Sequence, residues 1–462
     1  MKRIAIVGGG ISGLSAAFAL EEYIRGGVAA EYALYEASPR LGGVLLTEQI
    51  DGCVVEAGPD SFLSEKPWAT HLCRAVGLGD QLIGSNDAGR KTYILVRGKL
   101  VALPDGLMFM IPTKILPTGT SPLFSWKTKL RMAQEMFQPP RASNCDESVA
   151  SFLERHYGAE VVDRLADPLL SGVYGGEAAN LSVRAVLPRF AEMERTHGSL
   201  GRAMLALRSK MAPGSDKPPA SIFTSLKNGM QQLTEAIVAH LTPSSLLTNA
   251  PVEAIQREGD SWIVSAGYNS DDFDGVILAV PAYSAASLLR MCSRELSAEV
   301  ANIEYSSSIT VALGYDGAVR KSLPLGFGFL APRSEGKRLV AATFVHNKFP
   351  HRAPEDRALL RCFFAGSNAA SVWNLPDDGI TSLAKNDLQQ ILGLTADPLF
   401  SRVYKWKSAM AQYTVGHLDR LARIDRLCQQ LPGIALAGNA YRGIGVPDCV
   451  RSGREAVQQL LS

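Results

Sequence analysis

The residues that follow the first apolar segment constrain this chain most. RIAIV is a short β-branched run, typical of a buried parallel strand, and it leads into Gly8, Gly10 and Gly13 in the spacing G-x-G-x-x-G. The first glycine permits a tight turn, the second lets the backbone approach a pyrophosphate, and the third allows a helix to pack closely on the strand. The next residues, LSAAFALEEYI, are strong helix formers. The pattern predicts a strand, a phosphate-binding turn and a helix.

A basic pair before an apolar stretch is also how a secretory signal peptide begins. A signal peptide needs an unbroken apolar core, which three adjacent glycines would weaken by ~1 kcal/mol each relative to alanine. Glu36 favours the dinucleotide interpretation, because it ends the segment YALY 23 residues after Gly13, near the ~20 expected for the acid that binds ribose hydroxyls. The alternative role of Glu36 is a helix cap or a solvated loop residue. We expect no signal peptide and a cytoplasmic protein.

A second glycine turn follows in the segment RLGG. Arg40 offers a planar donor fork that suits phosphate, and Gly42 and Gly43 permit close approach of the backbone. The carboxylate of Glu36 would repel the 2′-phosphate of NADP, and pure NAD dehydrogenases do not need a second glycine turn. The two turns together therefore indicate FAD.

The composition excludes several classes of protein. The 462 residues are 46% hydrophobic and 20% charged with a net charge of +2, which is typical of an ordinary globular protein of two or three domains without a nucleic-acid partner. Seven cysteines form no CxxC pair and argue against both a zinc site and a disulfide framework. His346 and His351 are interpreted as surface histidines, so we expect no metal. No apolar run reaches the ~18 residues of a membrane span.

The order of these motifs resembles the flavin amine oxidase superfamily. GxGxxG, Glu36, RLGG and EAGPDSF appear in the family's order, and IALAGNAYRGIGVPDCVRSG resembles its C-terminal flavin-binding motif. Within the superfamily, essentially the whole chain resembles the oxygen-dependent, FAD-containing protoporphyrinogen and coproporphyrinogen oxidases. The segments that carry this narrower resemblance are RLGGVLLTE, EAGPDSFL, ADPLLSGVYGGEAANLSV, NKFPHRAPED, YKWKSAMAQYTVGHLDRL and GNAYRGIGVPDCVRSG.

The resemblance implies a set of cofactor residues and a non-covalent FAD. Asn439 replaces the Asp that is usual after Ala-Gly, and the helix from about Asp448 would point its positive end at the flavin. No cysteine lies where relatives attach flavin covalently, since Cys428 is in a helix-like charged segment and Cys449 comes too late. The implied FAD residues are Gly8, Gly10, Gly13, Glu36, Arg40, Gly42, Gly43, Gly58, Val252, Trp406, Gly438, Asn439, Gly443 and Val446.

The resemblance also implies substrate residues. Leu330 and Phe363 match positions that sandwich the macrocycle, although ordinary strand core is the alternative. Gly172 and Gly175 match a glycine-bearing pocket turn. Asp60 matches a position near the flavin, where it would assist proton loss or simply cap a turn.

Propionate groups call for arginine or lysine. Plant and animal relatives carry an arginine where this chain has Thr92, so Arg90, Lys91 or Arg97 would substitute unless they are solvated surface residues.

The predicted fold combines α/β and α+β elements in three parts. A discontinuous Rossmann-like FAD-binding domain covers 1–70, 224–290 and 405–462, a mixed-sheet substrate domain covers 71–104 and 291–404, and a helical domain covers 105–223. Residues 291–404 are expected to form strands joined by turns, in an antiparallel sheet over the flavin. Residues 211–220 are expected to form a Pro-rich surface loop. The stretch from Leu107 to Phe137 combines apolar residues with prolines and lysines. It is either a membrane-associating surface or a substrate-channel wall and core.

The expected activity is oxidation of a porphyrinogen to the porphyrin with O₂ as acceptor, giving H₂O₂, in haem biosynthesis. Removal of six hydrogens requires three flavin cycles, because a flavin accepts two electrons at a time. The alternatives are another flavin amine oxidase, for which Trp406 and Tyr441 would form an aromatic cage, a carotenoid desaturase, or a non-catalytic FAD or porphyrin carrier. Protoporphyrinogen and coproporphyrinogen are not distinguished, and a homodimer stays open.

Overall fold

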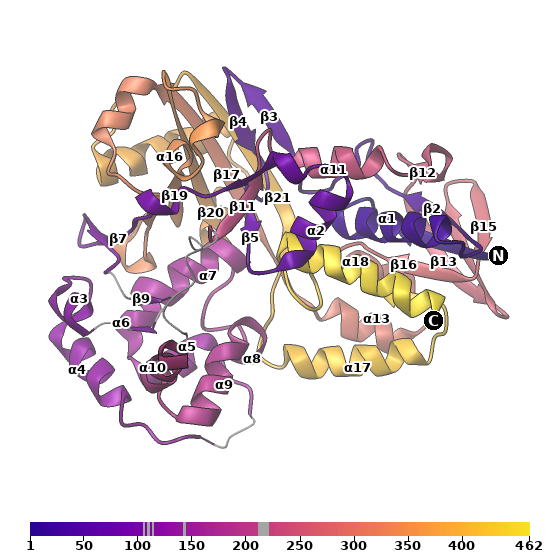
Figure 1. The fold of residues 1–462 in the computed structure, drawn as a ribbon, viewed down its shortest axis with the longest axis horizontal. Helices are drawn as coiled ribbons and strands as arrows, with labels where there is room; N and C mark the ends of the chain where they lie inside the picture. The colour runs from indigo at the N-terminus through magenta and orange to yellow at the C-terminus, as the bar shows by residue number, and fades with distance from the viewer. Residues whose placement is uncertain (105–106, 109–110, 113–114, 142–144, 211–220) are drawn as a thin grey trace. The chain divides into compact units, whose positions relative to one another are not determined.

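The structure is a computed structural model that describes residues 1–104, 107–108, 111–112, 115–141, 145–210 and 221–462 (Figure 1). The chain forms two compact units. Unit 1 contains Met1–Ser85, Ser221–Glu304 and Asp419–Ser462, and unit 2 contains Asn86–Ala220 and Tyr305–Leu418. The predicted loop at 211–220 lies outside the described residues, as does part of the stretch 107–137. The three-domain division stays a prediction.

Unit 1 is built on a five-stranded parallel sheet. In spatial order its strands are β12 (Leu246–Leu247), β2 (Ala30–Tyr35), β1 (Lys2–Val7), β16 (Gly275–Leu278) and β22 (Ile434–Leu436). β1 pairs with β2 on one side and with β16 on the other. The strand order therefore changes direction at β1, and loops at the carboxyl edge of such a switch point form a binding crevice.

The predicted opening strand and helix are confirmed. Ile4, Ala5 and Ile6 are buried in β1, as expected for a central parallel strand. α1 (Ile11–Arg25) follows and packs against α18 (Val446–Leu461). The two helices cross so closely that a Cβ on Gly453 would lie 2.2 Å from the Ser12 carbonyl oxygen. The first and last helices of the chain thus share one core.

The rest of unit 1 surrounds this sheet. Its other helices are α2 (Pro67–Ala75), α11 (Gln231–Val238), α12 (Ala282–Leu289), α13 (Arg294–Ala301) and α17 (His417–Gln429), the last of which begins in unit 2. Three antiparallel groups of strands complete it: β13 (Val252–Glu258), β14 (Ser261–Ala266) and β15 (Asn269–Phe273); β5 (Phe62–Leu63), β11 (Phe223–Leu226) and β6 (Leu82–Gly84); and β3 (Thr47–Ile50) with β4 (Cys53–Glu56).

Unit 2 contains a seven-stranded sheet. In spatial order its strands are β21 (Phe400–Ala411), β17 (Tyr305–Asp316), β20 (Arg357–Ala365), β19 (Ala341–Phe344), β18 (Gly328–Leu330), β7 (Thr92–Val96) and β8 (Lys99–Ala102). β18 and β7 are parallel, whereas the other neighbours are antiparallel. The mixed sheet is therefore confirmed, and the expectation of a purely antiparallel sheet is corrected at this one pair.

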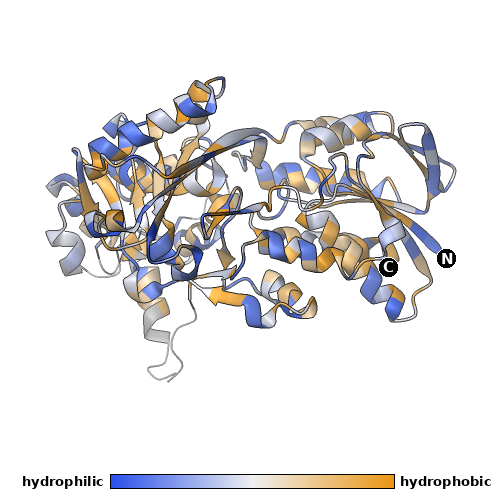
Figure 2. Cartoon of the chain, turned by 90° about the horizontal axis from the view of Figure 1, so that it is seen from above, coloured by the Kyte–Doolittle hydropathy of each residue, from blue (hydrophilic) through white to orange (hydrophobic). Residues whose placement is uncertain are grey.

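Helices cover both faces of this sheet. α16 (Asp377–Leu392) packs on one face, where Ile380, Ala384 and Leu388 share a core with sheet residues such as Phe364. The other face shares a core with the helical segment between β8 and β11. The elements of this segment are α3 (Ile115–Thr120), α4 (Trp126–Glu135), α5 (Val149–His156), α6 (Ala159–Val161), a π-helical turn (Val162–Ala166), α7 (Asp167–Tyr174), α8 (Val183–Val186), α9 (Pro188–His197) and α10 (Leu200–Lys210). Figure 2 shows predominantly hydrophobic strands beside helices of mixed character.

Two sequence expectations in unit 2 need correction. Residues 291–404 hold helices as well as strands: α14 (Val345–Lys348) and α15 (Gly366–Val372) in addition to α16, with α13 before them in unit 1. His346 is buried rather than on the surface, and burial lowers its pKa to about 4.

No helix in the described part of the chain has both the length and the apolar character needed to cross a bilayer.

Candidate functional site

The loop after β1 has the geometry of a phosphate-binding turn. Gly8 adopts φ +108°, and a Cβ there would lie 2.5 Å from the Ala279 carbonyl oxygen. A Cβ on Gly13 would lie 1.8 Å from the Gly8 carbonyl oxygen, so helix and turn are in direct contact. Gly10 differs, because its side-chain position meets no atom within 4 Å. It begins α1 without a capping side chain, which leaves open space at a helix N-terminus, where anions bind.

Glu36 lies directly beyond the carboxyl end of β2. Its carboxylate accepts hydrogen bonds from Gly9 N at 2.7 Å, from Ser38 N at 2.9 Å and from Ser38 Oγ at 2.7 Å. These contacts join the first glycine turn to the loop after β2. The half-buried Glu36 thus stands beside the fingerprint, where the spacing predicted an acid, and also shapes the turn.

The second glycine turn packs on the first. Gly42 N donates to Gly9 O at 2.8 Å, and a Cβ on Gly43 would lie 3.2 Å from Gly10 Cα. Arg40 braces this turn through its guanidinium, which donates to the carbonyl oxygens of Leu41, Gly43 and Leu45. Gly58 follows the end of β4 by two residues. A Cβ on Gly58 would lie 1.9 Å from the carbonyl oxygen of Val44, the residue after Gly43. The three glycines of RLGG and AGPD are therefore brought to one edge of the sheet with Gly8 and Gly10.

The loop after β22 reaches the same edge of the sheet. Gly438 adopts φ +127° with open space at its side-chain position, and Gly438 N donates to Ser452 Oγ on α18 at 3.1 Å. Asn439 follows and is half-buried. Gly443 adopts φ +116°, and a Cβ there would clash with Asp448 at 2.3 Å. α18 begins at Val446 rather than at about Asp448, because Gly445 caps the helix and Pro447 favours its first turn.

The sequence analysis missed an ion pair at this helix start. Lys66 Nζ lies 2.6 Å from Asp448 Oδ2, and Asp448 is 4% exposed. The same carboxylate accepts Gly445 N at 3.3 Å and so caps α18. The sequence Gly-Val-Pro-Asp could have predicted this helix cap. The ion pair could not have been predicted, because Lys66 lies 382 residues away in the sequence.

Two further predicted residues of unit 1 are found in ordinary structural positions. Val252 begins β13, next to an irregularity in the pairing with β14. Asp60 accepts a hydrogen bond from Ser61 Oγ at 2.6 Å, and its carbonyl oxygen accepts one from Ser225 Oγ at 2.6 Å. The contact with Ser61 is the one expected for a turn, and a catalytic role for Asp60 stays a prediction.

Three predicted residues of unit 2 share one face of its sheet. Leu330 pairs with Ala341, which pairs with Phe363, and Phe363 pairs with Thr310. Directly opposed residues lie on the same face of a sheet, as do residues two apart along a strand. Thr310 pairs with Tyr404, so Trp406, two residues on, also lies there. We call this side of the sheet the clamp face.

The predicted glycine turn of unit 2 adjoins this sheet. α7 packs against β20 and ends at Gly175, whose φ is +62°. A Cβ on Gly175 would lie 2.6 Å from Ser306 Oγ, so close approach requires glycine. Gly172 is exposed with open space at its side-chain position. Arg90 and Arg97 are both exposed, and Arg97 sits in the turn between β7 and β8 with its backbone N held by Glu335 at 2.6 Å.

The comparisons with known proteins place the chain in a family. Residues 11–461 match the family model described as flavin containing amine oxidoreductase. The chain belongs to that family. It is 34% identical to the coproporphyrinogen III oxidase of Bacillus subtilis (strain 168), covering 100% of this chain and 98% of the relative. It is 29% identical to the mitochondrial protoporphyrinogen oxidase of Nicotiana tabacum, covering 100% and 95%.

Solved structures agree with the family. A crystal structure from Exiguobacterium sp. 255-15, described as a candidate protoporphyrinogen oxidase, superposes with a TM-score of 0.88 at 31% identity over 100% of this chain and 99% of that one. Cyclohexylamine oxidase from Brevibacterium oxydans IH-35A has a TM-score of 0.71 at 17% identity and shares the fold. The flavin amine oxidoreductase fold predicted from the sequence is confirmed.

The unit 1 edge fits the cofactor of a flavin amine oxidoreductase. Open space lies at Gly10 and at Gly438, and two helix N-termini, those of α1 and α18, begin there. Backbone N–H groups at helix N-termini bind phosphate and other anionic groups. Within the described ranges no group of three histidine, cysteine or acidic side chains is placed to hold a metal ion. The residues present are thus those that a dinucleotide needs.

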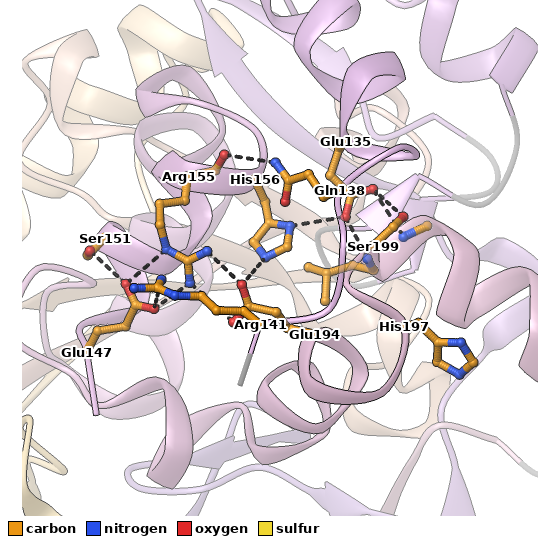
Figure 3. A network of polar contacts seen from close by, with 12 residues as sticks. Glu135, Gln138, Arg141, Glu147, Ser151, Arg155, His156, Glu194, His197 and Ser199 are labelled. Atoms are coloured by element: carbon orange, nitrogen blue, oxygen red, sulfur yellow. Dashed lines mark hydrogen bonds and ion pairs between the residues drawn. The ribbon is translucent and has the colours of Figure 1, made fainter. Parts of the chain in front are cut away.

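Unit 2 also contains a buried ionic network that the sequence did not predict (Figure 3). His156, which is fully buried, contacts Glu135 through Nδ1 at 3.1 Å and Glu194 through Nε2 at 3.3 Å. Glu135 also accepts Ser199 Oγ at 2.8 Å and Leu200 N at 2.6 Å. These contacts join α4, α5 and α9 to the start of α10.

The network shifts the pKa of its members in opposite directions. Burial alone would lower the pKa of His156, but the hydrogen bonds to Glu135 and Glu194 raise it above its ordinary value. Burial would raise the pKa of Glu194, but its contacts with His156 and Arg155 lower it to about 2. The pKa of Glu135 is likewise lowered, against its burial, by His156 and Ser199. The arrangement favours a charged imidazolium between two carboxylates.

Proposed function

We propose that the protein is an FAD-dependent porphyrinogen oxidase of haem biosynthesis. It oxidises coproporphyrinogen III or protoporphyrinogen IX to the porphyrin, with O₂ as acceptor and H₂O₂ as product. The observation that carries the proposal is the identity of 34% to a coproporphyrinogen III oxidase over 100% of this chain and 98% of the relative. The cradle at the carboxyl edge of the unit 1 sheet supports it, because its open glycine positions suit FAD.

The residues of the chain contribute binding and orientation. FAD, when bound, supplies the two-electron chemistry, so one porphyrinogen requires three rounds, three O₂ and yields three H₂O₂. The first turn of α1 and the open position at Gly10 would hold the pyrophosphate, with Glu36 beside it for the ribose hydroxyls. The start of α18, capped by Asp448, would present backbone N–H groups to the ring. Leu330 and Phe363 would pack against the macrocycle. Attachment of FAD is non-covalent in this proposal.

Aerobic turnover of the two porphyrinogens tests the function. We expect the yellow holoenzyme to produce porphyrin fluorescence from at least one of them, with three H₂O₂ formed per porphyrin. Cyclohexylamine and putrescine serve as controls and should give no H₂O₂. Fluorescence that rises no faster than autoxidation with both porphyrinogens would contradict the proposal. Denaturation in acid should release the flavin into the supernatant, and a flavin retained by the chain would contradict non-covalent attachment.

We further propose that unit 2 contacts an anionic membrane surface through α4. Trp126 is 81% exposed and Leu130 62%, one helical turn apart, and Phe137 beyond the helix is 85% exposed. Lys127 and Arg131 are exposed beside them, and Lys129 Nζ lies 4.8 Å from the Trp126 ring centroid. Apolar side chains beside cations suit monotopic attachment of a cytoplasmic protein.

Vesicle flotation tests this contact. The protein should float with vesicles that contain phosphatidylglycerol and not with pure phosphatidylcholine. Replacement of Trp126, Leu130 and Phe137 by Gln should abolish flotation. Replacement of Tyr268 and Met291, which are equally exposed in unit 1, should leave it unchanged. Flotation that is absent from the start would overturn the contact. Light scattering after size exclusion tests the expected homodimer separately.

A further inference from the structure

A pocket opens beside α4 in unit 2. Its volume is about 430 Å³, within the range of roughly 300–1,000 Å³ that is typical of small-molecule sites. One wall of the pocket is a single face of α4, because its residues recur at helical spacing: Lys127, Leu130, Arg131 and Gln134. All four side chains are exposed. Two cations, an amide and one apolar side chain therefore border the same space.

The other charged residues that line the pocket are already paired (Figure 3). The Arg155 guanidinium donates to the carboxylates of Glu147 and Glu194. The Glu135 carboxylate contacts His156 Nδ1 at 3.1 Å. A ligand that enters the pocket therefore meets no unpaired carboxylate among the lining residues, so nothing there attracts a cation.

Lys127 and Arg131 keep their positive charge for a ligand. The ion pairs of the surrounding helices join Arg155 and Arg164 to carboxylates, and neither Lys127 nor Arg131 has a carboxylate partner among the described residues. The Arg131 guanidinium donates to the Glu154 carbonyl oxygen at 2.7 Å, which fixes its position without neutralising it. Because Lys127 and Arg131 are four residues apart on a helix, they are neighbours and can share one anion.

Phosphate is the anion that suits this pair. An arginine fork and a lysine ammonium both donate to phosphate oxygens, and the amide of Gln134 adds further donors one turn on. A zwitterionic choline phosphate suits the pocket less well, because its ammonium would face two cations and no free carboxylate. The charges therefore favour a ligand with net negative charge.

The apolar side chains indicate that this phosphate belongs to a lipid. Leu130 lines the pocket, and it lies one helical turn from Trp126 on the exposed side of α4. A free phosphate would use the two cations but leave both apolar side chains in water. In a phospholipid the acyl chains begin a few bonds from the phosphate, so they would cover Leu130 and Trp126 while the phosphate lies between the cations.

We propose that the pocket beside α4 binds the head group of one anionic phospholipid, with Lys127 and Arg131 on its phosphate and Leu130 against the start of its acyl chains. The inference deepens the proposed membrane contact and rests on it. It goes beyond a general attraction to negative charge, because it makes the contact saturable with one lipid per chain.

Equilibrium dialysis with a short-chain lipid below its micellar concentration tests the pocket without a membrane. Dihexanoyl phosphatidylglycerol should saturate at one molecule per chain and bind at least tenfold more tightly than dihexanoyl phosphatidylcholine. Equal affinity for the two lipids, or no saturation with phosphatidylglycerol, would overturn the proposal. Glycerol 3-phosphate is the third probe, and binding as tight as that of the lipid would show that the pocket takes a soluble phosphate instead.

Three single variants separate the pocket from general electrostatics. Lys127→Gln and Arg131→Gln should each weaken binding of dihexanoyl phosphatidylglycerol at least fivefold. Lys129→Gln removes the same charge from the same helix, but Lys129 lies against the Trp126 ring and does not line the pocket, so binding should stay within twofold. Equal losses in all three variants would contradict a pocket.

Vesicle flotation distinguishes failure of this inference from failure of the membrane contact. A protein that floats with phosphatidylglycerol vesicles but does not bind the short-chain lipid removes the pocket alone. A protein that neither floats nor binds the lipid removes the membrane contact as well.

Discussion

Lys66 Nζ meets the carboxylate of Asp448 at 2.6 Å, and this carboxylate caps the last helix of the chain. The pair joins the segment before α2 to the start of α18 within unit 1. Since Asp448 is 4% exposed, it relies on partners from the protein rather than on water.

Lys66→Met should lower the free energy of unfolding by about 1–3 kcal/mol, because it removes a charged hydrogen bond from a buried carboxylate. Urea unfolding followed by circular dichroism measures the effect. Arg454→Met is the control, since Arg454 lies on the surface of α18 and pairs there with Glu22 of α1. That change should cost less than about 1 kcal/mol. Equal losses in the two variants would contradict the buried role of the pair.

Gly10→Val should produce folded protein without flavin. The new side chain meets no protein atom close to Cβ, so the fold is retained, but it occupies the space next to the helix N-terminus. Absorbance near 450 nm relative to protein concentration measures the loss. Gly79→Val, at an exposed position away from the cradle, should keep its colour. A yellow Gly10→Val protein would show that the pyrophosphate lies elsewhere.

The network around His156 should give unit 2 a pH-dependent stability. The raised pKa of His156 stabilises the fold fully below about pH 6.5, the unfolded value, and this contribution is lost as pH rises through the folded pKa. The pKa values of Glu135 and Glu194 are lowered, so both carboxylates stabilise the fold above about pH 4.3. This contribution is lost as the pH falls through their folded pKa values. The contribution is therefore largest between these values.

His156→Gln should cost about 3 kcal/mol of unfolding free energy near pH 5.5, with a smaller cost at pH 9. Urea titrations across this range measure the difference from wild type. His71→Gln, at an exposed position, should show a small difference at every pH. A cost that is independent of pH would show that His156 stabilises the helices by packing alone.

Cys145 should be the first cysteine to react with iodoacetamide at pH 8. It is exposed, whereas burial raises the pKa of Cys73, Cys428 and Cys449 to about 12. A thiolate is the reactive form, so buried neutral thiols react slowly. Peptide mass spectrometry over time measures the order of labelling. Faster labelling of Cys449 than of Cys145 would mean that the start of α18 opens readily.

The sequence predicted the parts of the fold that depend on local pattern. The strand before Gly8 and the helix after it, observed as β1 and α1, both follow from apolar runs and glycine spacing. α13 and α16 were missed because the surrounding segment reads as strands, and its many short apolar runs hide a helical period. The burial of His346 was missed for the same reason, since nothing local marks a histidine as interior.

Long-range polar contacts could not be predicted at all. Lys66 and Asp448, or His156 and Glu194, are ordinary charged residues in sequence, and only the packing of distant helices brings them together. The register that aligns Leu330 with Phe363 is equally invisible, because it depends on which strands become neighbours. The glycine cradle was predictable because each of its turns carries its own spacing.

The packing of α1 against α18 has a consequence for biosynthesis. A ribosome that adds about 5–20 residues per second reaches α18 roughly 20–90 s after it has made the first helix. Throughout this interval β1 exists without β22, and the surface of α1 around Ser12 has no Gly453 to cover it. The nascent chain must therefore carry the surface of α1 that later packs on α18 without its partner through nearly all of translation, which makes this surface a natural client for a chaperone at the ribosome exit.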